Sequence, residues 1–116
     1  MMKKSFLSIV FLVMVASQSL YAHSGGHDPV SEKEAIFIAS QTSLQFIDND
    51  PGLGFGKLND SWRHLPGSAQ TMHKTGEGYY IVSINNKSQN KTLYVLLSVE
   101  GEVYDANFSG VFPGLK

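Results

Sequence analysis

The sequence predicts an α+β fold with two layers, in which one main N-terminal helix packs on a four-stranded antiparallel sheet. Three observations predict it. Apolar residues recur at helical spacing after Ser31, alternate at strand spacing after Ala69, and flank a strong hairpin turn at Glu100-Gly101. A helix and a sheet that are each apolar on one face bury those faces against each other. We therefore expect one domain over residues 31–110, followed by a tail over 111–116.

The main helix is expected to begin at Ser31. Ser31 and Glu34 have the spacing of a capping box, in which each side chain accepts a hydrogen bond from the other residue's backbone N–H. Pro51 lies beyond the end of the helix, because proline cannot continue the helical hydrogen bonds. The buried face is expected to contain Ala35, Ile38, Ala39, Thr42 and Phe46, widened by Ile36, Leu44 and Ile47.

A second, short helix is expected near residues 58–64. Leu58 and Trp62 stand four residues apart, which places them on one side of a helical turn. Asn59 or Asp60 can cap that turn, because a short polar side chain accepts a hydrogen bond from the first backbone N–H groups. We expect one or two turns that pack onto the domain.

Four strands are expected in the second half of the chain. The first two cover residues 69–74 and 79–85, and the last two cover 92–99 and 102–108. The last pair flanks Glu100-Gly101, where glycine can take the positive φ that a two-residue hairpin turn requires. That turn predicts the pairs Val99–Glu102, Leu97–Tyr104, Val95–Ala106 and Leu93–Phe108, so that one face is almost entirely apolar.

The N-terminus has the order of a secretory signal peptide. Two lysines precede an apolar run over residues 6–16, and a polar segment then ends at Ala22. About eleven apolar residues are too few for a bilayer core that needs about twenty. We expect cleavage after Ala22, with cleavage after Ala16 as the alternative, and a flexible leader over 23–30. The mature protein is then periplasmic or secreted.

Composition excludes several classes of function. Removing residues 1–22 from the chain of 116 leaves 94 residues, with seven basic against ten acidic side chains and a net charge of −3. That balance lacks the basic footprint of a nucleic-acid-binding protein. The chain has no cysteine, which excludes disulfides, thiolate metal sites and lipid attachment through cysteine. We expect no nucleic-acid partner and no membrane attachment after signal cleavage.

Three stretches of the chain resemble an uncharacterised family of small exported bacterial proteins. They are residues 23–31 (HSGGHDPVS), Ser61-Trp62 and residues 92–110 (TLYVLLSVEGEVYDANFSG). The resemblance implies export and a compact domain, and it brings no established activity. The order helix, hairpin, hairpin is also similar to PepSY-type extracytoplasmic domains, which are associated with inhibiting or chaperoning peptidases. That similarity implies a protein-interaction module.

The first residues of the mature chain are the main candidate for a metal site. A chain that begins with His23 offers an α-amine and an imidazole Nδ1 from one residue, and His27 follows four residues later. Gly25 and Gly26 let the segment bend back at modest entropic cost. Nitrogen donors without thiolate favour Cu(II), and then Zn(II) or Ni(II). The alternative interpretation is a polar spacer that serves signal processing.

Three further residues are weaker candidates for metal ligands. Asp28 follows His27 directly, and His64 and His73 lie within the expected domain. In copper proteins with a histidine brace, the terminal histidine shares its ion with another imidazole from the fold. In this chain His64 and His73 are the histidines available for that role. Each is otherwise expected to be a surface residue.

We expect a binding protein rather than an enzyme. Asp60, Ser61 and His64 have the residue types of a hydrolytic triad, but positions on one short turn do not align as orienter, nucleophile and base. No G-x-S-x-G motif occurs in the chain. The ligand expected first is a Cu(II)-type ion. The alternative is an exported protein partner, which would bind at a sheet edge or on the sheet face away from the helix. That face is formed by Tyr94, Leu96 and Ser98 with Tyr79 and Ile81.

Overall fold

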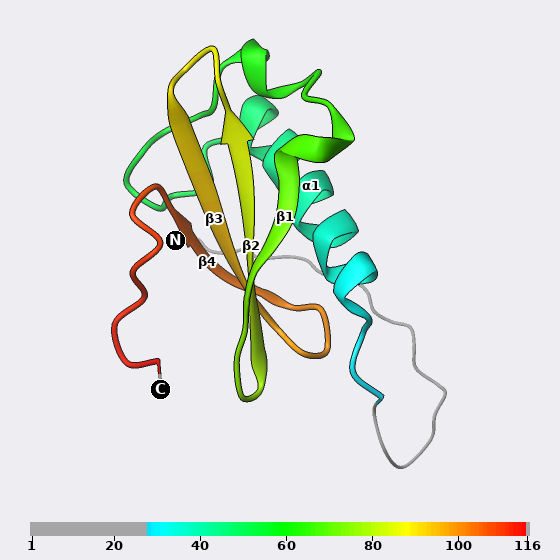
Figure 1. Cartoon of the computed structure of the whole chain (residues 1–116). Helices are drawn as coiled ribbons and strands as arrows, with labels where there is room; N and C mark the ends of the chain where they lie inside the picture. Colours follow the sequence, from blue (N-terminus) through cyan, green and yellow to red (C-terminus); the bar gives the residue numbers. More distant parts are fainter. Residues whose placement is uncertain (1–27, 116) are drawn as a thin grey trace.

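One helix lies across one face of a four-stranded sheet in the computed structural model, which describes residues 28–115 (Figure 1). The sheet is an antiparallel meander with the strand order β1-β2-β3-β4. This arrangement confirms the α+β prediction. The elements are α1 (Glu32–Asp48), the 3-10 turns η2 (Asp60–Trp62) and η3 (Gly67–Ala69), and the strands β1 (Gln70–Thr75), β2 (Tyr79–Asn86), β3 (Lys91–Ser98) and β4 (Val103–Asn107).

The start of α1 is the predicted capping box. Ser31 Oγ accepts a hydrogen bond of 3.0 Å from the Glu34 backbone N–H, and Glu34 Oε1 accepts one of 2.9 Å from the Ser31 backbone N–H. These two bonds satisfy backbone donors that the first helical turn leaves without a partner, which typically stabilises a helix by about 1 kcal/mol. The helix ends at Asp48, before Pro51, as predicted.

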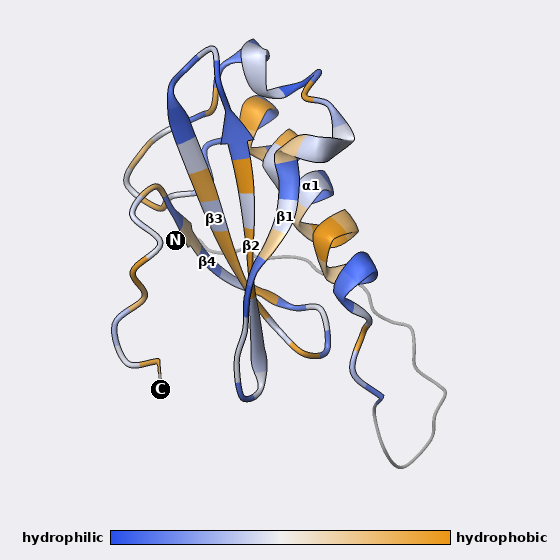
Figure 2. Cartoon of the chain, viewed as in Figure 1, coloured by the Kyte–Doolittle hydropathy of each residue, from blue (hydrophilic) through white to orange (hydrophobic). Residues whose placement is uncertain are grey.

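The main core lies between α1 and the inner face of the sheet. The central strands β2 and β3 supply its centre, and hydrophobic segments of these strands and of α1 meet there (Figure 2). Five branched side chains of these strands are completely buried, and burying each stabilises the fold by roughly 1.5 to 3 kcal/mol. They are Val82, Ile84, Leu93, Val95 and Leu97.

The predicted short helix is a single 3-10 turn. It covers Asp60–Trp62, and the Asn59 side chain caps it by accepting a hydrogen bond of 2.9 Å from the Ser61 backbone N–H. The turn places the Trp62 ring, which is only 3% exposed, against the core, where it contacts Phe108 at a ring-centroid distance of 6.1 Å. The element is therefore shorter than predicted, but it packs as expected.

The register of the last hairpin is only partly as predicted. The pair Val95–Ala106 is present, but Leu97 is opposite Val103 rather than Tyr104, because a β-bulge shifts the register after Leu96. The turn itself has three residues instead of two. Ser98 accepts a hydrogen bond from the Gly101 N–H and donates one to the Glu102 carbonyl, so Ser98 takes the place predicted for Val99. Gly101 has φ +92°, which suits the left-handed position of such a turn.

Much of the outer face of the sheet, the candidate interaction surface if left uncovered, is covered by the chain itself. The C-terminal segment folds back over it and inserts Phe112, which is 7% exposed, against Tyr79, Ile81 and Leu96. Tyr94 packs against the edge of this second cluster, and Ser98 is 5% exposed. The residues predicted to form a docking face are therefore largely used to hold the chain's own C-terminal segment.

The chain is hydrogen-bonded to the domain from Val30 onward. The Val30 backbone N–H donates a hydrogen bond of 2.8 Å to the Val99 carbonyl, and the Tyr80 hydroxyl donates one of 2.6 Å to the Val30 carbonyl. The predicted signal peptide and most of the leader, with His23 and His27, lie outside the described residues. Within residues 28–115 no helix is both long enough and apolar enough to cross a membrane.

Candidate functional site

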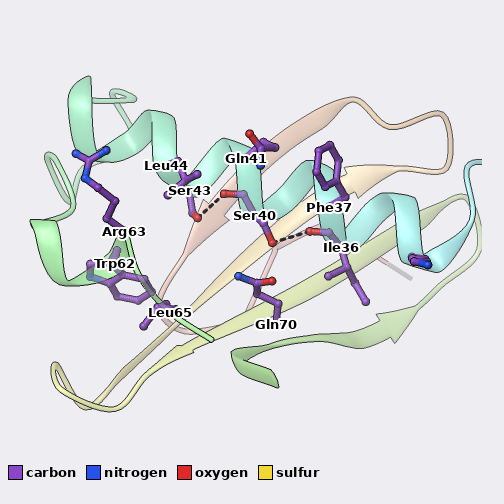
Figure 3. A pocket seen from close by; sticks show the side chains of 11 residues that line it. Ile36, Phe37, Ser40, Gln41, Ser43, Leu44, Trp62, Arg63, Leu65 and Gln70 are labelled. Carbon is purple, nitrogen blue, oxygen red and sulfur yellow. Dashed lines mark hydrogen bonds between the residues drawn. The ribbon is translucent and has the colours of Figure 1, made fainter. Parts of the chain in front are cut away.

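A groove of about 360 Å³ runs between α1 and the turns that lead into β1 (Figure 3). Its volume is within the usual range of ligand-binding clefts. One wall comes from α1, and the other comes from η2, the residues after it and the first residue of β1. The side chains that line it include Lys33, Phe37, Gln41, Trp62, Leu65 and Gln70.

The floor of the groove is apolar and held rigidly. Trp62 is buried beneath it, and Leu65 is half-buried and packs against the main core. From α1, Ile36 and Leu44 contribute half-buried side chains to the same floor. Because these residues also belong to the packing of the core, the floor is formed by the folded domain itself.

The hydroxyl groups in the groove are already occupied by the helix. Ser40 Oγ donates a hydrogen bond of 2.9 Å to the Ile36 carbonyl, and Ser43 Oγ donates one of 2.7 Å to the Ser40 carbonyl (Figure 3). Ser43 is 3% exposed, so this bond satisfies a buried polar group. Neither serine is arranged as a nucleophile with a base beside it.

Two side-chain amides in the groove have no partner among the described residues. Gln41 is exposed on α1, and Gln70 is half-buried at the start of β1, on the opposite wall. Each amide can donate and accept a hydrogen bond at the same time. The groove therefore offers polar groups to a ligand on both walls.

An exposed aromatic side chain stands at the edge of the groove. Phe37 is 64% exposed although it lies in the middle of α1. Its position is outside the apolar stripe that predicts the buried face of the helix. The sequence signal for this site was therefore a large apolar residue on the polar face of an otherwise regular amphipathic helix.

The charged side chains that line the groove are Lys33 and Arg63. Arg63 lies at one end, where its Nη2 is 3.1 Å from Asp60 Oδ1 and 3.3 Å from Asp48 Oδ1. Hydrogen bonds to Asp60 and Asp48 raise the pKa of the Arg63 guanidinium above its ordinary value. Lys33 at the other end has no ion-pair partner in the part of the chain that the structure describes. No carboxylate lines the groove.

The metal ligands predicted from sequence are only partly described by the structure. Asp28 is exposed and has no hydrogen-bond partner within residues 28–115. His64 is exposed in the turn after Arg63, close to the C-terminal end of α1. His73 is exposed at the bulge of β1, and its ring contacts the Tyr94 ring edge-on at 4.9 Å. The described residues contain no group of three or more His, Cys, Asp or Glu side chains that could hold a metal ion.

The triad residue types near η2 serve the fold. Ser61 Oγ donates a short hydrogen bond to Asn59 Oδ1 and accepts one of 2.9 Å from Asn86 Nδ2. Both partners of the hydroxyl are amides, so His64 is not placed as its base. The Asp60 carboxylate pairs with Arg63. These contacts explain Ser61 as part of a structural hydrogen-bond chain.

Comparison with known proteins gives a family and no activity. No curated protein and no solved structure is significantly similar to the chain. A family model described as "Family of unknown function (DUF6488)" matches residues 2–111, which includes the N-terminal segment, the helix and all four strands. The match spans nearly the whole sequence, and the chain therefore belongs to the DUF6488 family.

Proposed function

We propose that this protein is a small exported binding protein without catalytic activity, and that its mature N-terminus holds a Cu(II)-type ion through His23 and His27. Zn(II) and Ni(II) would bind the same nitrogen donors more weakly. The terminal α-amine and the His23 imidazole would form a chelate on one flexible residue, and His27 would add a third nitrogen.

The way in which the chain joins the domain supports this proposal. Two hydrogen bonds hold Val30, and the capping box holds Ser31, so the tightly bound part of the chain begins there. Asp28, two residues earlier, is exposed and makes no contact that the fold requires. A carboxylate next to His27 is therefore free to complete a coordination shell.

The two histidines proposed as additional ligands, His64 and His73, lie at different distances from the point where the leader joins the domain. The helix α1 has 17 residues and is about 25 Å long, and Arg63, the residue before His64, contacts its last residue. The seven residue-to-residue steps from His23 to Val30 span at most about 25 Å when fully extended. A leader that bends back to share one ion between His23 and His27 would be too short to meet His64.

His73 is the better placed of the two. Thr75, two residues later, donates a hydrogen bond of 2.6 Å from Oγ1 to Glu32 Oε2, at the first residue of α1. The strand end that carries His73 is therefore close to the point where the leader joins the domain. The His73 ring lies against Tyr94 on the face of the sheet away from α1, but β1 is an edge strand, so His73 is the one of the two histidines that we expect a leader to reach, around that edge.

The test is a Cu(II) titration of the exported protein, after its N-terminal residue has been determined by intact-mass analysis. We expect electron paramagnetic resonance to show directly coordinated nitrogen, and we expect His23→Ala to remove most Cu(II) uptake. His64→Ala is the matched control and should leave uptake unchanged. A mature chain that begins elsewhere, or a His23→Ala isotherm equal to that of the parent, would overturn the proposal.

A second candidate function is a PepSY-like protein-interaction module in the periplasm, and the groove beside Phe37 favours it. A photo-crosslinking amino acid placed at position 37 in the exported protein should give a discrete adduct with one partner, identified by mass spectrometry. The same probe at Tyr104, which is 59% exposed on the opposite edge of the sheet, should not give it. Equal adducts from both positions, or none from position 37, would contradict this function.

A further inference from the structure

We infer that the groove between α1 and β1 binds an extended peptide segment that has an apolar anchor side chain flanked by acidic residues. This inference rests on the second candidate function and names the chemistry of its partner. It does not depend on the metal proposal, because none of the groove residues belongs to the leader.

The apolar anchor is indicated by the floor and the rim of the groove. Leu65 and the buried Trp62 form an apolar floor, and Phe37 is 64% exposed at its edge. Covering an exposed aromatic side chain removes apolar surface from water, and such residues contribute strongly to binding. An apolar side chain of a partner can lie on this floor and contact the Phe37 ring.

The unpaired side-chain amides indicate that the bound segment is an extended peptide rather than a helix. The peptide groups of a helix are already bonded within the helix, so a docked helix has little use for side-chain amides in a groove. An extended segment presents unpaired N–H and C=O groups. Gln41 on one wall and Gln70 on the other can each bond to both kinds of group.

The position of Gln70 supports the same geometry. Gln70 begins β1, which is an edge strand with no neighbour on its outer side in the described part of the chain. The bulge at His73 interrupts the regular ladder after Met72. A peptide backbone can therefore run beside residues Gln70–Met72, and the bulge prevents a long added strand.

The charges indicate acidic flanking residues. The groove is lined by Lys33 and Arg63 and by no carboxylate, although the mature chain has a predicted net charge of −3. The nearby aspartates already compensate Arg63. Lys33 has no such partner among the described residues, so it is the cation that can pair with an acidic residue of the peptide.

The length of the groove along α1 determines how long the bound peptide segment can be. From Lys33 to Leu44 the helix wall rises about 16 Å, since each residue adds 1.5 Å. An extended chain covers that length with about five residues. A short linear motif is therefore sufficient to fill the groove.

The experiment uses the isotopically labelled mature protein and three blocked pentapeptides as probes in an NMR titration. The first is Glu-Val-Phe-Val-Glu, which carries the proposed anchor and charges. The second, Lys-Val-Phe-Val-Lys, reverses the charges, and the third has N-methyl groups on its backbone. We expect the first peptide to shift the Trp62 indole and the Gln41 and Gln70 side-chain signals. The second should bind about threefold more weakly, and the third should lose the glutamine shifts.

Phe37→Ser tests the anchor and Tyr104→Ser is the matched control. Both residues are exposed aromatics, so neither substitution should unfold the domain. We expect Phe37→Ser to weaken binding of the first peptide about tenfold and Tyr104→Ser to leave it unchanged. Shifts outside the groove, equal binding of the lysine peptide, or equal effects of the two substitutions would overturn the inference.

The extended-peptide inference can fail while the proposed interaction function still holds. A specific crosslink at position 37 together with no peptide binding would mean that the partner uses a folded surface. That outcome would overturn the extended-peptide inference and leave the interaction function in place.

Discussion

Asn86 Nδ2 donates a 2.9 Å hydrogen bond to Ser61 Oγ, which joins the end of β2 to the 3-10 turn that holds Trp62 in the core. Asn86 is completely buried, and its Oδ1 accepts hydrogen bonds from Ser88 Oγ at 2.8 Å and from the Gln89 N–H at 3.2 Å. One buried amide therefore connects the β2–β3 turn to the floor of the groove.

Replacing Asn86 with alanine should destabilise the protein by about 2 to 3 kcal/mol. The substitution leaves buried donors and acceptors without partners, and such groups are costly in the interior. Asn85→Ala is the control, because Asn85 is exposed and makes one 2.9 Å bond to Thr92. It should cost less than about 1 kcal/mol. Urea denaturation measures both, and equal losses would contradict a special role for Asn86.

Replacing Phe112 with alanine should cost up to about 3 kcal/mol and expose the outer face of the sheet. Phe112 is the side chain that covers Tyr79, Ile81 and Leu96, and removing a buried phenylalanine loses its burial and leaves a cavity. Val111→Ala is the control, since Val111 is 66% exposed. Thermal unfolding and binding of a hydrophobic dye should change for Phe112→Ala alone. Unchanged dye binding would show that the segment does not cover this face in solution.

Replacing Gly101 with alanine should destabilise the last hairpin more than the same change at Gly78. Both glycines have positive φ, so each alanine is strained by roughly 1 to 2 kcal/mol. A Cβ at Gly101 would also lie 3.0 Å from Ile38 Cδ1, whereas a Cβ at Gly78 meets nothing within 4 Å. Moving the Ile38 side chain should add about 0.5 to 1.5 kcal/mol. Equal losses in chemical denaturation would mean that Ile38 adjusts without cost.

Replacing His73 should alter Cu(II) binding more than replacing His64. The strand end near His73 lies at the end of the domain where the leader joins, and His64 lies at the other end of α1. We expect His73→Ala to reduce the number of coordinated nitrogens or the affinity, and His64→Ala to change neither. A metal ion competes with protons for nitrogen ligands, so uptake should also fall in mild acid. A larger effect of His64→Ala would contradict the placement of the leader.

The elements with strong local signals could be predicted from the sequence alone. The capping box at Ser31 and Glu34 and the alternation in β2 depend on residues within a few positions of one another, so the chain specifies them without its distant parts. The turn near Gly101 was harder to predict. Its positive φ is a local property, but the third turn residue and the bulge after Leu96 also involve how β4 lies on β3.

The amino-acid sequence by itself determined the helix, the four strands and their shared apolar face, because period, capping and turn chemistry are local properties of the chain. Only the tertiary structure decided that Phe112 covers the outer face, that Ser61 bonds to Asn86, and that Phe37 stays exposed beside a groove. Each of these depends on which distant residues become neighbours, and burial is a property of that whole arrangement rather than of any segment.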